Sequence, residues 1–417
     1  MKLLLLNTND ISGGAAIAAL VSVKGSPQSG MEAEMLVQSK KSDDYSVIGP
    51  ETKLEKSVEK LSPVLDNIPV SFYKYRKKSM FSPAIVPDRI LKKIKDVNPD
   101  VVHLHWITSG FIKIETLVKI SKPMIWTLHD MWAFTGGCHY NEECGKYINN
   151  CGYCPILSSN KKNDLSSKIW KRKKKAWENL DLTIVTPSSW LGECAKKSSL
   201  FCNTRVEVIP NGINLNRFKI IDKNIARDIL CLPQDKKLVL FGSLSALSNR
   251  RKGFSLLKET FKKYFSKKNK DIELIIFGSS KPRDEESLGF KTYYLGRLND
   301  EISLALIYSA ADAMIVPSMQ DNLPNTVMES LACGTPVVAF NIGGIPDMID
   351  HQKNGYLAKS FETEDLAYGI KWVLEDANRR EKLSENAREK VVKEFDIVKV
   401  AKRYTDLYKD VLKIKNV

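Results

Sequence analysis

The sequence predicts an α/β protein of two domains with parallel sheets, and three observations support this. The chain has 417 residues, which is long enough for two domains that each bury a full core. A turn at Pro210-Asn211-Gly212 lies in residues 198–235, where we expect the chain to cross between the domains. Short apolar runs alternate with helical stretches on both sides of this segment, as buried parallel strands do. We expect strands at residues 3–6, 33–38, 99–106, 124–128, 181–186, 237–241, 273–277, 293–295, 313–316 and 337–340.

The composition, with 43% hydrophobic and 27% charged residues, is that of a soluble globular protein. No apolar run approaches the ~20 residues that a membrane span needs. The apolar run at residues 3–6 is too short for a signal peptide, so we expect a cytoplasmic protein. The net charge of +15 favours acidic partners, so nucleic acid, anionic lipid and phosphorylated substrates all come into consideration.

Residues 313–340 read as strand, loop, helix, loop and strand, and they carry two acids, Asp321 and Glu329. This spacing lets the first acid lie on the loop and the second one turn into the helix, both facing one ligand. We expect Asn322 or Asn325 to cap the start of the helix. Backbone N–H groups at the helix start would face the same place, and such groups bind phosphate.

This stretch resembles the donor-sugar motif of retaining GT-B glycosyltransferases of the family-4 type, an acid followed by seven residues and then glutamate. In that family the first acid lies beside the donor sugar and the second binds the nucleotide ribose, and the resemblance implies these roles for Asp321 and Glu329. Asp321 stands where the family usually has the longer glutamate. Loop and helix N–H groups hold the donor diphosphate in the family, which implies donor contacts at Asn322, Leu323, Asn325 and Thr326.

A glycine pair, Gly13 and Gly14, follows the first expected strand and precedes a helical stretch. Glycine lets the backbone approach a ligand closely, and the family carries a Gly-Gly loop here that faces the donor diphosphate. The resemblance therefore implies donor binding by both glycines. The first strand is not followed by Gly-x-Gly-x-x-Gly, so the dinucleotide-binding fingerprint is absent.

The segment after residue 241 matches the family in part. Lys252, which precedes a glycine, corresponds to the family's lysine on the donor diphosphate, whereas Ser243 stands where an arginine is usual. Arg250 or Arg251 would supply the missing cation, and we include Arg251 in the expected donor site.

Three histidines lie on or just past the carboxyl ends of two expected strands, where open α/β sheets bind ligands. The family has a histidine here that contacts the donor sugar, and the resemblance implies this catalytic role for His129. Asp130 follows it and is placed to fix the orientation of its ring. We expect His103 to be a packed residue, and both interpretations stay open for His105.

Four of the eight cysteines lie within 17 residues and end in Cys-x-x-Cys, namely Cys138, Cys144, Cys151 and Cys154. This pattern suits a tetrahedral structural zinc site. A metal is favoured over two disulfides in a reducing cytoplasm. The alternative is four unliganded thiols or reversible disulfides. For catalysis itself we expect no cofactor.

Residues 166–180 predict a helix with Trp170 and Trp177 on one side and a run of basic residues at 171–175. A basic amphipathic helix of this kind suits an anionic membrane surface. A helix packed in the core with a solvated basic face is the alternative, and the sequence does not decide between them.

The resemblance covers nearly the whole chain and implies a GT-B fold, in which two Rossmann-like domains face each other across a cleft. We expect an N-terminal acceptor-side domain at 1–204, a nucleotide-sugar-binding domain at 205–398, and a C-terminal helix at 399–417 that packs back on the first domain. The implied reaction is metal-independent transfer, with retention, from a UDP- or GDP-linked sugar. The expected acceptor is a saccharide, in particular a lipid-linked one, of surface-polysaccharide biosynthesis. The protein would then lie in the cytoplasm and bind peripherally to the inner face of the plasma membrane.

Three alternatives remain from the sequence. Another GT-B enzyme, such as a sugar-nucleotide epimerase, would act without an acceptor. A non-catalytic relative is kept open by Ser243 and Asp321. A basic nucleic-acid-binding protein is supported by net charge alone, and because no nucleic-acid-binding motif appears we expect no nucleic-acid partner.

Overall fold

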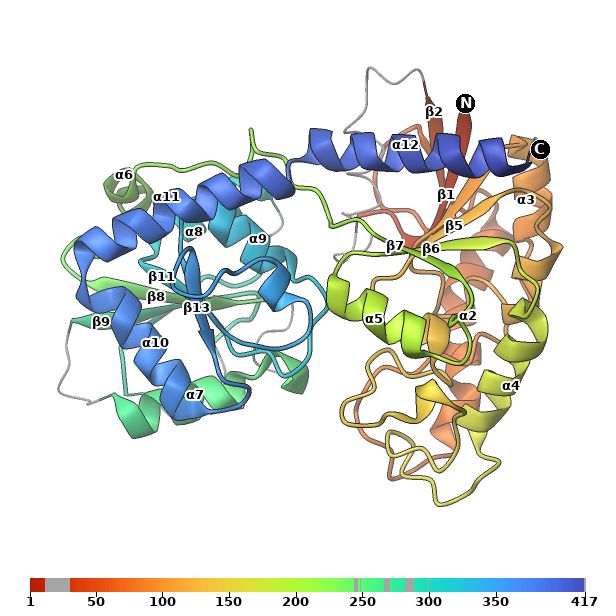
Figure 1. Cartoon of the computed structure of the whole chain (residues 1–417), viewed down its shortest axis with the longest axis horizontal. Coiled ribbons are helices and arrows are strands. Elements are labelled where there is room, and N and C mark those ends of the chain that lie inside the picture. The colour runs from red at the N-terminus through yellow and green to blue at the C-terminus, as the bar shows by residue number, and fades with distance from the viewer. Residues whose placement is uncertain are drawn as a thin grey trace. The chain divides into compact units, whose positions relative to one another are not determined.

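The computed structural model describes residues 1–11, 31–243, 247, 249–265, 271–281, 289–298 and 300–415. It divides into two compact units, which are coloured by position in the chain in Figure 1. Unit 1 comprises Met1–Pro210 together with Val400–Val417, and unit 2 comprises Asn211–Lys399. Each unit is an α/β domain with its own parallel sheet, so the expected fold class is confirmed.

The sheet of unit 1 has the strand order β3-β2-β1-β4-β5-β6-β7. Alternate residues of its central strand β1 enter two different cores: Leu4 and Leu6 lie in one, and Leu3 and Leu5 lie in the other. The sheet is therefore covered on both faces, as apolar parallel strands require. Its strands are β1 (Lys2–Asn9), β2 (Glu32–Ser39), β3 (Val47–Ile48), β4 (Val101–Leu104), β5 (Met124–Thr127), β6 (Leu182–Thr186) and β7 (Arg205–Val208).

The last helix, α12 (Ile397–Lys415), covers one face of this sheet, as the C-terminal helix was expected to do. A hydrogen bond of 2.8 Å joins the Tyr408 hydroxyl to His103 Nδ1, and another of 3.1 Å joins the Tyr404 hydroxyl to Thr127 Oγ1. Thr127 in turn contacts His103 Nε2 at 2.8 Å, so both ring nitrogens of His103 are used inside the core. The apolar side chains that α12 packs against the sheet are Val400, Leu407 and Val411. Within the part of unit 1 that the structure describes, the other α-helices are α2 (Lys53–Ser71), α3 (Ile90–Val97), α4 (Leu165–Trp177) and α5 (Ser189–Lys197).

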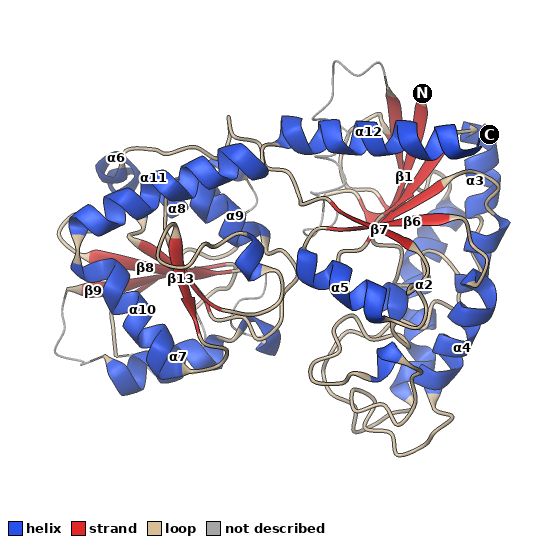
Figure 2. Ribbon diagram, in the orientation of Figure 1, coloured by secondary structure: helices blue, strands red, loops and turns tan. Residues whose placement is uncertain are grey.

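Unit 2 repeats this layered plan with the strand order β10-β9-β8-β11-β12-β13, and Figure 2 shows helices flanking each sheet. Leu238 and Leu240 of its strand β8 enter one core, whereas Val239 and Phe241 enter the other. The strands are β8 (Lys237–Gly242), β9 (Ile272–Phe277), β10 (Thr292–Tyr294), β11 (Ala313–Val316), β12 (Val337–Phe340) and β13 (Gly355–Ala358). The helices are α6 (Lys223–Ile229), α7 (Phe254–Tyr264), α8 (Glu301–Ala310), α9 (Asn325–Ala332), α10 (Thr363–Glu375) and α11 (Ala377–Glu394).

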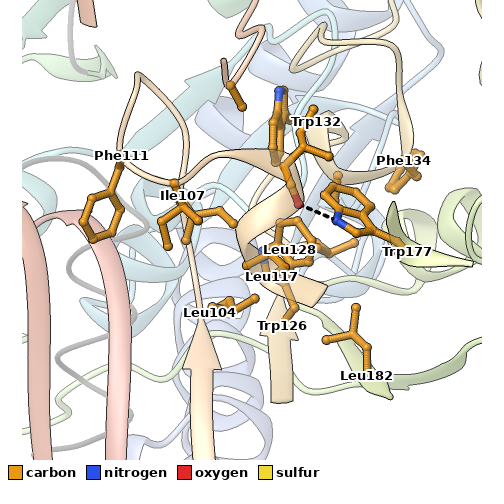
Figure 3. Close-up of a cluster of buried hydrophobic side chains, with 14 of the residues drawn as sticks. Leu104, Ile107, Phe111, Leu117, Trp126, Leu128, Trp132, Phe134, Trp177 and Leu182 are labelled. Carbon is orange, nitrogen blue, oxygen red and sulfur yellow. Dashed lines mark hydrogen bonds between the residues drawn. The ribbon is translucent and has the colours of Figure 1, made fainter. Parts of the chain in front are cut away.

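Of the two alternatives left open for the helix at 166–180, the structure favours packing in the core. Trp170 and Trp177 of α4 are both buried, and Trp177 Nε1 donates to Ile114 O at 3.0 Å inside the aromatic core of unit 1 (Figure 3). Lys173, from the basic run, is fully buried as well. It lies over the Trp132 ring at 3.7 Å and donates to the carbonyl oxygens of Trp132 and Thr135. Helix α4 is therefore a core helix, because both of its tryptophan side chains are packed inside unit 1 and are not available to a membrane.

Among the residues that the structure describes, no helix combines the length and the apolar character that crossing a membrane requires.

Candidate active site

The loop between β11 and α9 positions the residues of the expected donor motif. Helix α9 begins at Asn325, and its N-cap is Pro324, which makes no side-chain capping bond. The expectation that Asn322 or Asn325 caps the helix is therefore wrong. Asn325 is instead the first helical residue, and its Oδ1 accepts a hydrogen bond from Asn211 Nδ2 at 3.2 Å. Thr326 follows it in the first turn, and Leu323 and Asn322 are buried in the loop.

Asp321 is buried on this loop and is paired with two cations. Its Oδ2 lies 2.7 Å from Lys252 Nζ, and its Oδ1 lies 3.1 Å from Arg251 Nη1. Burial alone would raise the pKa of the Asp321 carboxyl, but the two cations outweigh it and hold the pKa well below its usual range. Asp321 is therefore ionised at every physiological pH. Arg250, the other candidate for the missing family arginine, is exposed, so Arg251 is the arginine that reaches the loop.

Two glycines allow the close packing that brings these residues together. Gly343 has φ +55°, and a Cβ there would lie 1.9 Å from the Asp321 carbonyl oxygen. Gly253, with φ +73°, lies so close to Pro317 that a Cβ would lie 1.7 Å from its carbonyl oxygen. Both positions need glycine for the left-handed backbone and for the space. The short helical turn that carries Arg251 and Lys252 is thereby pressed against the loop that carries Asp321.

Glu329 lies one turn into α9 and has a different partner. Its Oε2 accepts a hydrogen bond of 2.7 Å from the hydroxyl of Tyr308, a buried residue of α8. Burial raises the pKa of the Glu329 carboxyl to about 7, and the Tyr308 hydrogen bond opposes this only in part. The Glu329 carboxyl therefore changes its charge near neutral pH. Tyr308 was not among the residues expected from the sequence, because the apolar helix that precedes β11 gives no signal of a polar contact.

In unit 1, His129 contacts a second histidine. His105 Nδ1 lies 3.0 Å from His129 Nε2, and the two rings stack with centroids 5.3 Å apart. Burial lowers the pKa of His129 to about 4 and that of His105 well below its usual range. Both rings are therefore neutral at pH 7, and a single hydrogen joins them. His105, left open by the sequence, is thus a hydrogen-bond partner of His129.

Asp130 binds other partners than expected. Its Oδ2 accepts hydrogen bonds of 2.8 Å from Trp106 Nε1 and 2.7 Å from His139 Nδ1, and its Oδ1 accepts from the Trp132 amide at 2.8 Å. It acts on His129 through its charge, which raises the imidazole pKa against the larger effect of burial. A pocket in unit 1 is lined by His105, His129, Asp130, Trp106, Ile107, Thr108, Trp126, Leu128, Trp132 and Ala133.

The remaining expected residues are placed as follows. Gly13 and Gly14 lie outside the described residues. Ser243 follows β8, and its Oγ is buried without a hydrogen-bond partner in the described part of the chain.

The four clustered cysteines are free thiols, namely Cys138, Cys144, Cys151 and Cys154. They are close enough that the other three each raise the pKa of the Cys138 thiol, and Cys151 Sγ accepts the Gly136 amide at 3.2 Å.

The four thiols do not form a finished metal site. Within the described ranges, no group of three or more His, Cys, Asp or Glu side chains has the arrangement needed to hold a metal ion. The structural zinc therefore stays a prediction, and no step of the reaction proposed below uses it.

The two layered units and the loop that joins an acid to a helix start define a glycosyltransferase of the GT-B class. The chain matches the model of Glycosyltransferase Family 4 over residues 33–217 and that of Glycosyl transferases group 1 over residues 222–390. It belongs to this family of glycosyltransferases.

Named relatives agree with this assignment. The chain is 30% identical over 217 residues to "Uncharacterized glycosyltransferase MJ1607" of Methanocaldococcus jannaschii, an alignment that covers 49% of this chain and 54% of the relative. It is 24% identical over 279 residues to "Putative colanic acid biosynthesis glycosyl transferase WcaC" of Escherichia coli, and this alignment covers 63% of this chain and 64% of the relative. A third relative is "N,N'-diacetylbacillosaminyl-diphospho-undecaprenol alpha-1,3-N-acetylgalactosaminyltransferase" of Campylobacter jejuni. It is 29% identical over 209 residues, and the alignment covers 48% of this chain and 53% of the relative. The matches thus span between half and two thirds of these relatives.

Solved structures of low sequence identity share the fold. The sucrose-phosphate synthase of Thermosynechococcus elongatus has a TM-score of 0.70 and 19% identity, covering 99% of this chain and all of the other. Anabaena Alr3699/HepE in complex with UDP has a TM-score of 0.63 and 16% identity, covering 98% of this chain and 100% of the other.

Proposed function

We propose that this protein transfers a sugar from a nucleotide-sugar to a saccharide acceptor, with retention at the anomeric carbon. The observation that carries this proposal is the cluster at the start of α9, where Asp321, Lys252 and Arg251 meet within hydrogen-bond distance. A pair of cations beside a helix N-terminus suits a diphosphate. The nucleoside diphosphate is the leaving group of the reaction, and these groups stabilise the negative charge that it gains as the bond to the sugar breaks.

The donor diphosphate binds at this cluster and at the start of α9. In the free protein the Asp321 carboxylate offsets one of the two positive charges of Lys252 and Arg251, so the cluster keeps a net positive charge that suits a diphosphate. When the donor arrives, its phosphates share these cations, and the Asp321 carboxylate is available to the donor sugar. The ribose hydroxyls donate to the Glu329 carboxylate, which Tyr308 holds in place.

The reaction proceeds on one face of the sugar. The acceptor hydroxyl oxygen forms a bond to the anomeric carbon as the bond from that carbon to the phosphate oxygen breaks. The departing phosphate oxygen takes the proton of the acceptor hydroxyl, and the products are the glycoside and the nucleoside diphosphate. Lys252, Arg251 and the helix start stabilise the leaving group, so the step requires no metal ion. His129, a neutral ring, positions the donor sugar by hydrogen bonding.

The donor is linked to UDP or GDP, and the acceptor is a lipid-linked saccharide of surface-polysaccharide biosynthesis. Support comes from relatives whose names specify colanic acid biosynthesis and a diphospho-undecaprenol acceptor, and from a similar fold that was solved with UDP. An acceptor of this kind lies in a membrane, so the protein works at the cytoplasmic face of that membrane.

Thermal unfolding with UDP-, GDP- and ADP-sugars tests the donor. A donor at ~100 times its dissociation constant stabilises the folded state by about 2.7 kcal/mol, so the cognate nucleotide-sugar raises the melting temperature and the others do not. Incubation of this donor with lipid-linked saccharides then yields a glycoside whose anomeric configuration matches the donor. An epimer formed without acceptor would favour the epimerase alternative, and the absence of any shift would overturn the proposal.

We also propose that the four clustered cysteines hold a structural zinc ion once their side chains converge. Their mutual proximity and the amide donated to Cys151 support this. Metal analysis of the purified, reduced chain is expected to find zinc that is lost in a variant with serine at Cys151 and Cys154. Equal zinc in both proteins, or none in either, would contradict it.

A further inference from the structure

Helix α2 presents its apolar side to solvent, the reverse of an ordinary surface helix. Its exposed large apolar side chains recur every three or four residues and continue just beyond its end, so they share one face of the helix. Their exposed fractions range from 46% to 78%. We name the following six residues the α2 stripe: Leu54, Val58, Leu61, Leu65, Ile68 and Phe72.

The opposite face of α2 is fixed against unit 1 by polar contacts. The Asp66 carboxylate is buried and accepts the backbone N–H groups of Ala84 at 3.2 Å and Ile85 at 2.8 Å. The helix backbone also lies directly on Gly110, where a Cβ would be 2.5 Å from the Ser62 carbonyl oxygen. Rotating the helix to bury the α2 stripe would remove a buried acid from its donors and break this contact. The exposure of the stripe is therefore built into the fold of unit 1, in which α2 is the orange-red helix of Figure 1.

Cations border the α2 stripe. The acids Glu55 and Glu59 of the helix are only half exposed, and Glu55 is held by the capping box with Thr52 and by Lys93 at 3.3 Å. The aromatic side chains of Phe72 and Tyr75, at the end of the stripe, are 78% and 90% exposed. The exposed basic residues along the helix and just after it are Lys53, Lys56, Lys60, Lys74, Lys77 and Lys78, of which Lys77 is paired with Glu142.

We propose that the α2 stripe docks on an anionic membrane surface, with its apolar side chains among the acyl chains and the flanking lysines at the headgroups. An exposed apolar stripe of this length marks a binding site. The basic border selects the partner, because helices that lie in the membrane interface combine an apolar face with lysines that attract anionic lipid. Pairing of two stripes in a dimer would bring two lysine borders together and is disfavoured. The inference deepens the proposed function and rests on it for the presence of the acceptor in a membrane.

Co-sedimentation with vesicles tests the docking surface. The full chain is mixed with vesicles of phosphatidylcholine and phosphatidylglycerol, or of phosphatidylcholine alone, and is expected to pellet mainly with the anionic vesicles. The triple variant Leu61→Gln, Leu65→Gln and Ile68→Gln is expected to lower the partition coefficient about 10-fold or more, because three apolar side chains no longer enter the membrane. The matched control replaces Ile225, Ile229 and Ile302, which are 56–59% exposed on unit 2, by glutamine and binds as the unmodified chain does.

A second variant isolates the charge. Lys74→Gln with Lys78→Gln is expected to reduce binding to anionic vesicles and to weaken its salt dependence, while the small residual binding to neutral vesicles stays unchanged. Equal pelleting of the Leu61/Leu65/Ile68 variant and the unmodified chain would overturn the proposal. So would a dimer that this variant dissociates, or an equal loss in the unit 2 control.

The thermal shift produced by the donor separates this inference from the proposed function. All variants are expected to melt at similar temperatures and to keep the full shift, because the changed residues are exposed and lie outside the donor site. Loss of vesicle binding with an intact donor shift supports the α2 stripe. An intact shift without any vesicle binding by the unmodified chain contradicts the stripe but leaves sugar transfer standing.

Discussion

Asp321 and Glu329 belong to one loop and helix, yet the protein treats their carboxyl groups in opposite ways. Asp321 is paired with Lys252 and Arg251, which keep its pKa well below the usual range. Glu329 contacts a phenol, and burial raises its pKa to about 7. The difference teaches that the charge of each acid is set by side chains from other elements, the turn after β8 in one case and α8 in the other.

The largest expected effect comes from replacing Lys252, one of the two cations that are paired with Asp321. Lys252→Met is expected to lower kcat by about 10²–10³-fold, because one preorganised group that stabilises the leaving diphosphate is lost. Steady-state rates of transfer measure it. The control is Lys263→Met, which changes an exposed lysine on α7 and should leave kcat unaltered. A wild-type rate in the Lys252 variant would place the diphosphate elsewhere.

Asp321→Asn tests the other member of the pair. It leaves two half-buried cations without their carboxylate and is expected to cost about 3 kcal/mol of folding free energy at pH 7. Because the folded pKa of Asp321 is lowered, its stabilisation is present above the ordinary value of 3.8 and is lost as the pH falls toward the folded value. The stability difference between the two proteins, measured by denaturant unfolding, should therefore shrink in acid. A difference independent of pH would contradict the ion pair.

Glu329→Gln is expected to weaken donor binding by about 10-fold at pH 8, the loss of a hydrogen bond to a charged group. Since the folded pKa of Glu329 is about 7, against an ordinary value of 4.5, the unmodified protein should bind donor more tightly as the pH rises through 7. The variant should show no such rise. The same raised pKa means that Glu329 contributes stability below its unfolded pKa and loses it as the pH rises through about 7, so the variant should melt higher than the unmodified protein at pH 8.

The smallest effect is expected for Tyr308→Phe, which removes only a hydroxyl. The Tyr308 hydrogen bond lowers the pKa of Glu329, so its loss should move the pH dependence of donor KM to higher pH. At pH 7 we expect KM to rise about 3-fold, and at pH 9 to be nearly normal, while kcat stays the same. An unchanged pH profile would show that Tyr308 packs beside Glu329 without influencing its charge.

Much of the fold could be predicted because its strands are buried on both faces and therefore read as apolar runs. The runs at 313–316 and 337–340 are strands β11 and β12 at the expected positions. Shorter or partly exposed strands, such as β3 with two residues and β7, lack this signal and were not expected. Helix α4 was ambiguous because the sequence shows two tryptophans but not the space that they fill.

The site was predictable where a motif lies in one segment, and less so where segments meet. Asp321 and Glu329 are close in the chain, whereas the contacts of Tyr308 with Glu329 and of Arg251 with Asp321 join distant elements. The pairing of His105 with His129 likewise depends on the neighbouring positions of β4 and β5 in the sheet. Such contacts follow from the fold, and a periodic pattern in one segment cannot reveal them.

Helix α12 gives the molecule an unusual order of assembly. Residues 1–210 emerge from the ribosome long before residues 400–417, which complete the core of unit 1, and unit 2 is synthesised in between. Until then Leu3, Leu5 and Ile125 lack the helix that covers them. The nascent N-terminal domain therefore has to wait, with an apolar sheet face uncovered, for a segment made after unit 2, and a premature stop near residue 399 would leave that face open to aggregation.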